Sequence, residues 1–195
     1  MNDFLIDKTM LFIKKNSNYS DKELLKIHYG MEGIFLTIAK VLVILLIGII
    51  FNYLDTVIIT MIFFNILRFF AFGLHAKKSM HCLIISIIEF NILPYIFLHI
   101  NLSSTIIWTI FGISLISFIL YAPADTEKRP LTNKTKRRNR KILSIVSLIV
   151  LIFIALKVTY LTKTIMVAFL IEDFSINPLS YKMLGLPYKN YKKLA

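Results

Sequence analysis

Long runs of apolar residues alternate with short polar breaks along most of the chain. Five runs come close to the ~20 residues that a helix needs to cross a hydrocarbon core of about 30 Å. They cover residues 34–51, 54–72, 83–100, 105–121 and 142–160. The runs are continuous and rich in Ile, Leu and Phe, without the alternation of barrel strands, so they are expected to be helices.

A sixth apolar stretch, 161–174, is shorter than the usual minimum of about 17 residues for a span and contains Lys163, Glu172 and Asp173. It could be a tilted span or a re-entrant hairpin. We predict a sixth, short transmembrane helix. The fold class is therefore all-α, a polytopic integral membrane protein with about six transmembrane helices.

The composition agrees with this class. Of the 195 residues, 57% are apolar and only 17% are charged, which leaves too little polar surface for a water-soluble globule. No repeat or low-complexity linker is present, so we predict one membrane domain over residues 1–195. Residues 1–33 would form a cytoplasmic helical segment, 34–174 the transmembrane helices and 175–195 a basic cytoplasmic tail.

The distribution of lysine and arginine predicts the orientation, because basic loops stay on the cytoplasmic side. Eight cations lie between residues 123 and 141. Counting crossings from that segment puts the turns at 52–53 and 101–104, which have no basic residue, outside. Both basic termini are then cytoplasmic if the sixth stretch crosses, and so is the break at 73–81.

That break is followed by the only cysteine of the chain, Cys82, at the amino-terminal end of a predicted helix. The helix dipole and the cations Lys77 and Lys78 would favour a thiolate, and His75 could accept its proton. On an unbroken helix, positions 75 and 82 would stand about 10 Å apart, too far for proton transfer. The chain must therefore fold back, and Gly73 can supply the backbone angles.

Other interpretations of this segment stay open. A lone cysteine in a membrane helix is usually a small buried side chain, and a histidine at a helix end is usually a solvated cap. His81 competes with His75 as the base, although on a helix it would point about 100° away from Cys82. A zinc site of these three residues lacks a second cysteine pair, so we predict no metal and no cofactor.

Two charged residues lie inside the apolar runs that flank the break. Arg68 is in the second run and Glu89 in the third, and such groups cost several kcal/mol in hydrocarbon unless they are paired or face a polar cavity. We expect the two to face each other below the loop. A purely structural ion pair, or snorkelling of Arg68 to the interface, would also explain them.

Three motifs occur together: GLHAKKSMHC at 73–82 with Arg68 five positions before its glycine, YAPADTEKRPL at 121–131, and HYGMEG at 28–33. With this combination, most of the chain resembles the accessory gene regulator B (AgrB) family of bacterial membrane endopeptidases. The motif at 73–82 departs from the usual Gly-Gly-x-His form of that family, because Phe72 stands where the first glycine is usual.

The resemblance implies that His75 and Cys82 are the catalytic pair, supported by Arg68 and Gly73. It implies a cysteine endopeptidase in the cell membrane of a bacterium, with its active site facing the cytoplasm. Such enzymes remove the tail of a small membrane-associated quorum-sensing propeptide and hold the remainder as a thioester. A cysteine or serine side chain of the peptide then closes a thiolactone or lactone ring.

The basic segment and the net charge of +12 suit an acidic peptide tail or the headgroups of membrane lipids. We therefore take Lys136, Arg137 and Arg138 as candidate substrate-binding residues, and we add Glu89 from the third apolar run to this set. Nucleic acid is not expected, because the cations lie in short loops beside the membrane. The oligomeric state stays open, with a homodimer as one option.

A non-enzymatic protein is the alternative function. It would be a small transporter or an assembly partner in which Arg68, Glu89 and His75 line a polar path. Such a protein would tolerate Cys82→Ser, whereas a cysteine protease would not. A third catalytic residue also stays open, because the sequence does not show that Asp125 reaches His75.

Overall fold

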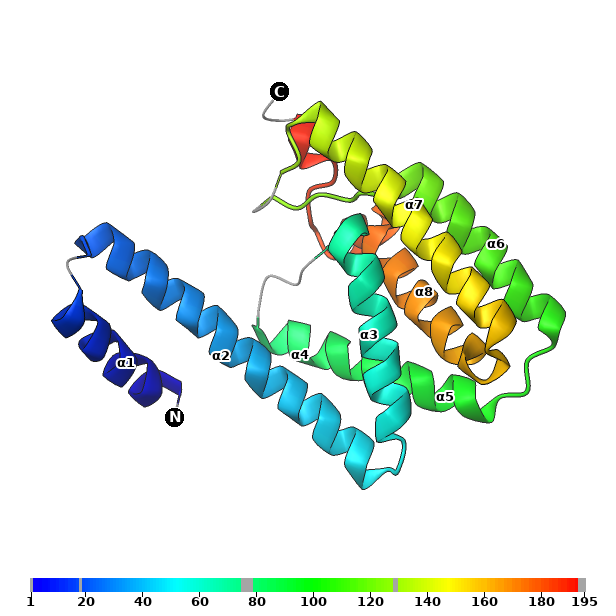
Figure 1. The fold of residues 1–195 in the computed structure, drawn as a ribbon, viewed down its shortest axis with the longest axis horizontal. Coiled ribbons are helices and arrows are strands. Elements are labelled where there is room, and N and C mark those ends of the chain that lie inside the picture. The colour runs from blue at the N-terminus through cyan, green and yellow to red at the C-terminus, as the bar shows by residue number, and fades with distance from the viewer. Residues whose placement is uncertain (1, 18, 75–78, 128–129, 193–195) are drawn as a thin grey trace. The chain divides into compact units, whose positions relative to one another are not determined.

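The computed structural model describes residues 2–17, 19–74, 79–127 and 130–192 (Figure 1). Its α-helices are α1 (Asn2–Asn16), α2 (Asp21–Ile50), α3 (Leu54–Ala71), α4 (Ser79–Ile87), α5 (Leu93–His99), α6 (Ser104–Tyr121), α7 (Lys134–Lys157), α8 (Thr162–Ile176) and α9 (Pro178–Met183). A π-helical turn, η1 (Ile88–Ile92), joins α4 to α5, and η2 (Thr159–Leu161) and η3 (Asn190–Lys192) are 3-10 turns. Apart from isolated bridges, these residues contain no strand, so the all-α prediction is confirmed.

In the part of the chain that the structure describes, five helical stretches are long and apolar enough to cross a membrane: α2, α3, Met80–His99, α6 and α7. They correspond to the five predicted apolar runs. Many of their large apolar side chains face outward, among them Ile113 and Ile116 of α6, each 59% exposed, and Phe153 of α7, 60% exposed. An apolar outer surface of this extent is what contact with lipid requires.

Two of these helices, α2 and α7, begin eight or more residues before their apolar runs. α2 starts at a capping box in which the Glu23 carboxylate accepts from the backbone N–H of Ser20 at 2.9 Å. α7 starts at Lys134, where the Asn133 side chain accepts from the backbone N–H of Lys136 at 3.0 Å. Because lysine and arginine are good helix formers, the first turns of α7 carry much of the basic segment.

The chain forms two compact units, Met1–Leu46 and Ile47–Ala195. The first unit consists of α1 and most of α2. The second contains α3 to α9 and the candidate functional residues between Arg68 and Arg138 that the structure describes. The prediction of one domain over the whole chain stays a prediction.

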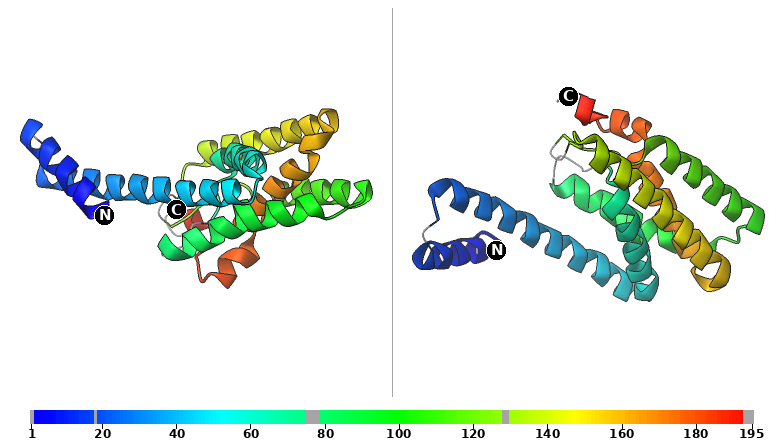
Figure 2. Two further views of the ribbon diagram at one scale, coloured as in Figure 1. Left: turned by 90° about the horizontal axis from the view of Figure 1, so that it is seen from below. Right: turned by 45° about the horizontal axis from the view of Figure 1, so that its top comes forward.

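α8 is the central helix of the second unit, where it packs on α3, α5, α6 and α7 (Figure 1, Figure 2). Six consecutive residues, 164–169, are buried, whereas an amphipathic surface helix would bury a single stripe. The helix has 15 residues, fewer than the usual minimum of about 17 for a span, and is not among the five candidate spans. Its burial makes α8 the core around which the longer helices pack, and the prediction of a sixth transmembrane helix stays a prediction.

α8 also returns the chain from one end of this unit to the other. Near its start, the Lys163 ammonium donates to the Ile100 carbonyl at 2.8 Å, just after α5. Near its end, the Ser175 carbonyl accepts from the Leu74 backbone N–H at 2.9 Å, just after α3. The segment that follows α8 consequently lies at the same end as the start of α7, where Arg140 donates to the Phe69 carbonyl.

We predict that residues 52 and 102 lie outside the cell and that residues 136 and 182 lie in the cytoplasm, since the structure puts these pairs at opposite ends and basic segments stay inside. Single cysteines would be introduced at these positions in a Cys82→Ala background. A membrane-impermeant maleimide should label the first pair in intact cells and the second pair only after permeabilisation. Labelling at 136 from outside would contradict the orientation, and opposite sides for 136 and 182 would contradict the return through α8.

Candidate active site

Three backbone segments meet where α3 ends. The Ala71 carbonyl accepts from the Ala124 N–H, and the Gly73 N–H donates to the Ala124 carbonyl, each at 2.9 Å. On the other side, the Leu74 N–H donates to the Ser175 carbonyl at 2.9 Å. Buried backbone groups need such partners when no water reaches them. The chain that leads into the break is thus held between the loop after α6 and the end of α8.

Arg68, in the last turn of α3, joins two of these parts through its side chain, the chain that leads into the break and α8. Its Nη1 lies 3.5 Å from Oε2 of Glu172 in α8, and its Nη2 donates to the Leu74 carbonyl. The Glu172 side chain is 0% exposed, so the pair is removed from solvent on its acidic side. Breaking a buried pair on one side is costly, because the remaining charge has no partner.

We expected Arg68 to pair with Glu89, but in the structure Arg68 forms its ion pair with Glu172. Glu89 lies half-buried in η1 and interacts electrostatically with Arg68, but the carboxylate within ion-pair distance is that of Glu172. The physical reason is the central position of α8, which brings its acidic residue against α3.

Gly73 is required by two features of this site. Its φ of +128° is in a region that side chains rarely adopt. A Cβ at this position would overlap Nη1 of Arg68 and would lie 3.0 Å from the Ser175 carbonyl oxygen. The close approach of the guanidinium to the backbone thus depends on the missing side chain.

Cys82 lies in the first turn of α4, as the sequence predicts, and is half-buried with a free thiol. The neighbouring His81 is exposed. His75, Lys77 and Lys78 lie outside the described residues, so the pairing of His75 with Cys82 stays a prediction. Among the residues that are described, no cluster of three His, Cys, Asp or Glu side chains could hold a metal ion.

Asp125 holds the chain that follows α9. One carboxylate oxygen, Oδ1, accepts from the Asn190 N–H at 3.0 Å, and the other, Oδ2, accepts from the N–H groups of Tyr191 at 2.7 Å and Leu131 at 3.3 Å. The Tyr181 hydroxyl donates to the Asp125 carbonyl at 3.2 Å, and burial raises the pKa of Tyr181. Asp125 is only 2% exposed, which makes it an organiser of the backbone.

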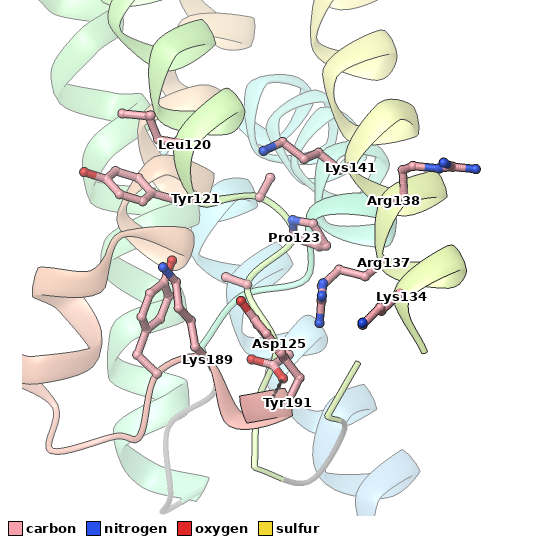
Figure 3. Close-up of a pocket in the computed structure, with 13 residues that line it drawn as sticks. Leu120, Tyr121, Pro123, Asp125, Lys134, Arg137, Arg138, Lys141, Lys189 and Tyr191 are labelled. Atoms are coloured by element: carbon pink, nitrogen blue, oxygen red, sulfur yellow. Dashed lines mark hydrogen bonds between the residues drawn. The ribbon is translucent and has the colours of Figure 1, made fainter. Parts of the chain in front are cut away.

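The candidate substrate-binding residues fall in two places. Arg137 and Arg138 line a pocket of about 310 Å³ between the end of α6, the start of α7 and the tail (Figure 3). We call it the basic pocket; Lys136, which is exposed, does not line it. Glu89 belongs instead to the polar cluster around Arg68.

Sequence reasoning missed the acidic residues of α8 as members of this polar cluster. Glu172 pairs with Arg68, and the next residue, Asp173, accepts from the Ser114 hydroxyl of α6. It also missed Asn91, which is buried in η1 and accepts from the Tyr53 hydroxyl at 3.3 Å. The signal was present, because acidic residues inside an apolar run usually mark a buried partner or a polar cavity.

The family model for accessory gene regulator B matches residues 6–176, most of the chain. The chain belongs to the AgrB family. An AgrB-like protein of Listeria monocytogenes is 34% identical over 186 residues, covering 94% of this chain and 91% of its own. One from Clostridium acetobutylicum is 33% identical over 189 residues, covering 96% and 90%.

The accessory gene regulator protein B of Staphylococcus aureus is 29% identical over 176 residues, which cover 90% of this chain and 94% of its own. No solved structure gives a significant match. Membership of the AgrB family supports a role in the accessory gene regulator quorum-sensing system and implies involvement in propeptide processing.

Phe72 stands at the position where the resemblance leads us to expect a glycine. It has φ +60° and ψ −139°, a conformation that glycine adopts readily and that costs other residues about 1–3 kcal/mol. The Arg140 guanidinium lies 4.5 Å from the centroid of its ring. The backbone at this position is therefore of the kind that glycine favours, although a phenylalanine occupies it.

We predict that Arg68→Ala destabilises the protein by about 3–5 kcal/mol, because it leaves Glu172 buried without its cation. The double variant Arg68→Ala/Glu172→Ala should recover much of this loss, since no unpaired charge remains. The measurement is thermal unfolding in detergent, followed by circular dichroism. Arg68→Ala/Glu89→Ala is the matched control, and an equal recovery in that variant would show that Glu89 is the true partner.

We also predict that Gly73→Ala is destabilising by more than about 2 kcal/mol, since it combines an unfavourable φ with steric overlap. Gly185 has a φ of +60°, and a Cβ there would meet nothing within 4 Å. Gly185→Ala should therefore cost only the backbone contribution, about 1–2 kcal/mol. Equal losses for the two variants in the same unfolding assay would rule out the close approach at Gly73.

Proposed function

We propose that the protein is a membrane cysteine endopeptidase that removes the carboxy-terminal tail of a small quorum-sensing propeptide and promotes cyclisation of the remainder. Cys82 is the nucleophile and His75 the general base. The observation that carries the proposal is the position of Cys82 in the first turn of α4, at the far side of a short break whose near side is clamped by Arg68. The first turn of a helix is the end at which the helix dipole stabilises a nearby negative charge, such as that of an attacking thiolate.

The reaction has two acyl-transfer steps. The Cys82 sulfur, after giving its proton to His75, attacks the carbonyl of the scissile peptide bond, and the C–N bond breaks as His75 protonates the leaving amine. This releases the tail and leaves a thioester. A thiol or hydroxyl of the bound peptide then gives its proton to His75 and attacks the thioester carbonyl. The new ring bond forms, and Cys82 leaves as the thiolate.

Arg68, Glu172 and Gly73 act in this proposal as positioning residues. Arg68 donates to the carbonyl of Leu74, the residue directly before His75, and the Leu74 N–H donates to the Ser175 carbonyl, so the backbone there is held on both sides. Proton transfer needs the donor and acceptor within about 3 Å, so an anchored approach to His75 favours catalysis. The surrounding helices would limit access of water, which lets ring closure compete with hydrolysis.

We further propose that the site faces the bacterial cytoplasm and that the basic start of α7 attracts the acidic part of the propeptide. Lys136 and Arg138 are exposed, and Arg137 is half-buried beside them. Together with Glu89, they are the candidate substrate contacts.

One feature favours this enzyme over a transporter with a polar path. The Arg68 guanidinium pairs with the Glu172 carboxylate and donates to the Leu74 carbonyl. It therefore holds the backbone at the start of the break in place. A residue that lines an open path would keep its charge turned towards the passing solute.

We predict that Cys82→Ala and Cys82→Ser abolish cleavage of a co-expressed propeptide, because alanine has no nucleophile and a serine hydroxyl does not readily form an anion. His75→Ala should reduce cleavage by about 10²-fold or more, the usual contribution of a general base. His81→Ala is the matched control and should retain substantial activity. Membranes that contain both proteins are incubated, and cleavage is measured by immunoblotting for the released tail.

The wild-type protein should also accumulate a peptide fragment on Cys82 that survives an acid quench and is released by hydroxylamine. Mass spectrometry of the quenched protein identifies the modified residue. Attachment of the fragment to another residue, or normal cleavage by Cys82→Ala, would refute the mechanism.

A further inference from the structure

The basic pocket lies where α6 ends, α7 begins and the chain after α9 returns. Its lining combines cations and tyrosines with a few small residues (Figure 3). The residues are Leu120, Tyr121, Ala122, Pro123, Ala124, Asp125, Lys134, Arg137, Arg138, Lys141, Tyr188, Lys189 and Tyr191. Its volume of about 310 Å³ is at the lower end of the range for small-molecule sites, about 300–1,000 Å³.

The positive charge of the pocket is not compensated within the described structure. Among the described residues of its lining, five are cations and Asp125 is the only acidic one. Both oxygens of that carboxylate accept backbone N–H groups. No described residue forms an ion pair with Lys134, Lys141 or Lys189. An anion that enters the pocket would therefore meet several unpaired donors.

The cations of α7 have different tasks. Arg137 stacks on the Tyr191 ring at 3.9 Å and donates to the Leu131 carbonyl, so it also holds the wall of the pocket. Lys134 and Lys141 lie on the same side of the helix, towards Pro123 and the tail, whereas the Arg138 guanidinium points away from them (Figure 3). Lys134 and Lys141 are thus the cations best placed to bind a ligand.

The position of the pocket along the helices points to a lipid. It lies where the apolar part of α6 ends at Tyr121 and that of α7 begins at Ile142. Leu120, which lines the pocket, is 60% exposed, and Ile142 is 54% exposed. Apolar side chains on the outside would contact acyl chains, while tyrosines and lysines at this depth contact the headgroup region. Tyr188 also lines the pocket, and its hydroxyl is a hydrogen-bond donor.

We propose that the basic pocket binds the phosphate group of an anionic phospholipid headgroup, with Lys134 and Lys141 as its main ligands. The bound lipid would hold the start of α7 against the loop after α6 and the tail. This inference goes beyond peptide processing and does not depend on the chemistry of Cys82. A lipid can place its anionic headgroup in the cationic pocket and its acyl chains on the neighbouring apolar surface. A soluble acidic ligand would use only the pocket.

Native mass spectrometry of the full-length protein in detergent, titrated with phosphatidylglycerol or phosphatidylcholine, tests the proposal. The wild-type protein should retain phosphatidylglycerol preferentially. Lys134→Gln/Lys141→Gln should weaken that retention at least about tenfold, as expected for two cations near a lipid phosphate, and Lys134→Arg/Lys141→Arg should preserve it. Lys136→Gln/Lys182→Gln removes the same charge outside the lining and should change retention by less than about twofold.

Several outcomes would overturn the assignment. Equal retention of the two lipids, or unchanged retention in Lys134→Gln/Lys141→Gln, would exclude a headgroup site in this pocket. Displacement of the lipid by inorganic phosphate, but not by chloride at the same ionic strength, would identify a site for free phosphate. Displacement by a polyglutamate peptide at a concentration below that of the lipid would assign the pocket to peptide binding. The circular dichroism spectra of all variants must match that of the wild type, since each altered side chain is at the surface of α7 or α9.

Discussion

The buried ion pair between Arg68 and Glu172 is the interaction on which the rest of the second unit depends. It joins α3 to α8 across 104 positions of the chain, and the same guanidinium holds the backbone of Leu74. A charge inside an apolar bundle is tolerated only where it is paired. The pair therefore fixes which face of α8 is turned to α3, and it restricts Gly73 to a residue without a side chain.

Around this pair, backbone hydrogen bonds connect segments that are distant in sequence. Residues 71–74 bond to Ala124 on one side and to Ser175 on the other, and Asp125 carries the connection on to Asn190. The motif at 121–131 thus has a structural explanation, because its alanine and aspartate supply partners for the break and the tail. The bundle end that contains the basic segment is assembled from four separate parts of the chain.

The five apolar runs could be predicted because continuous hydrophobicity is a property of each run alone. The first turn of α4 at Cys82 and the need for glycine at 73 were also visible locally. The partner of Arg68 was not, because Glu89 and Glu172 both lie in apolar segments, and only the packing of α8 decides between them. The charges of α8 argued against a span that faces lipid, and in the structure its two acidic residues do face inward, Glu172 to Arg68 and Asp173 to Ser114.

Phe72 has a backbone conformation that glycine adopts more readily than phenylalanine does. Its φ of +60° is unfavourable for phenylalanine by about 1–3 kcal/mol, yet Ala71 and Gly73 on either side are held by hydrogen bonds to Ala124. The Arg140 guanidinium, which also donates to the Phe69 carbonyl, lies 4.5 Å from the centroid of the Phe72 ring. A cation–π contact of this kind contributes about 0.5–2 kcal/mol, enough to offset much of the strain. The unfavourable backbone at Phe72 is thus matched by a contact with α7, and the hydrogen bonds on either side hold the approach to the break.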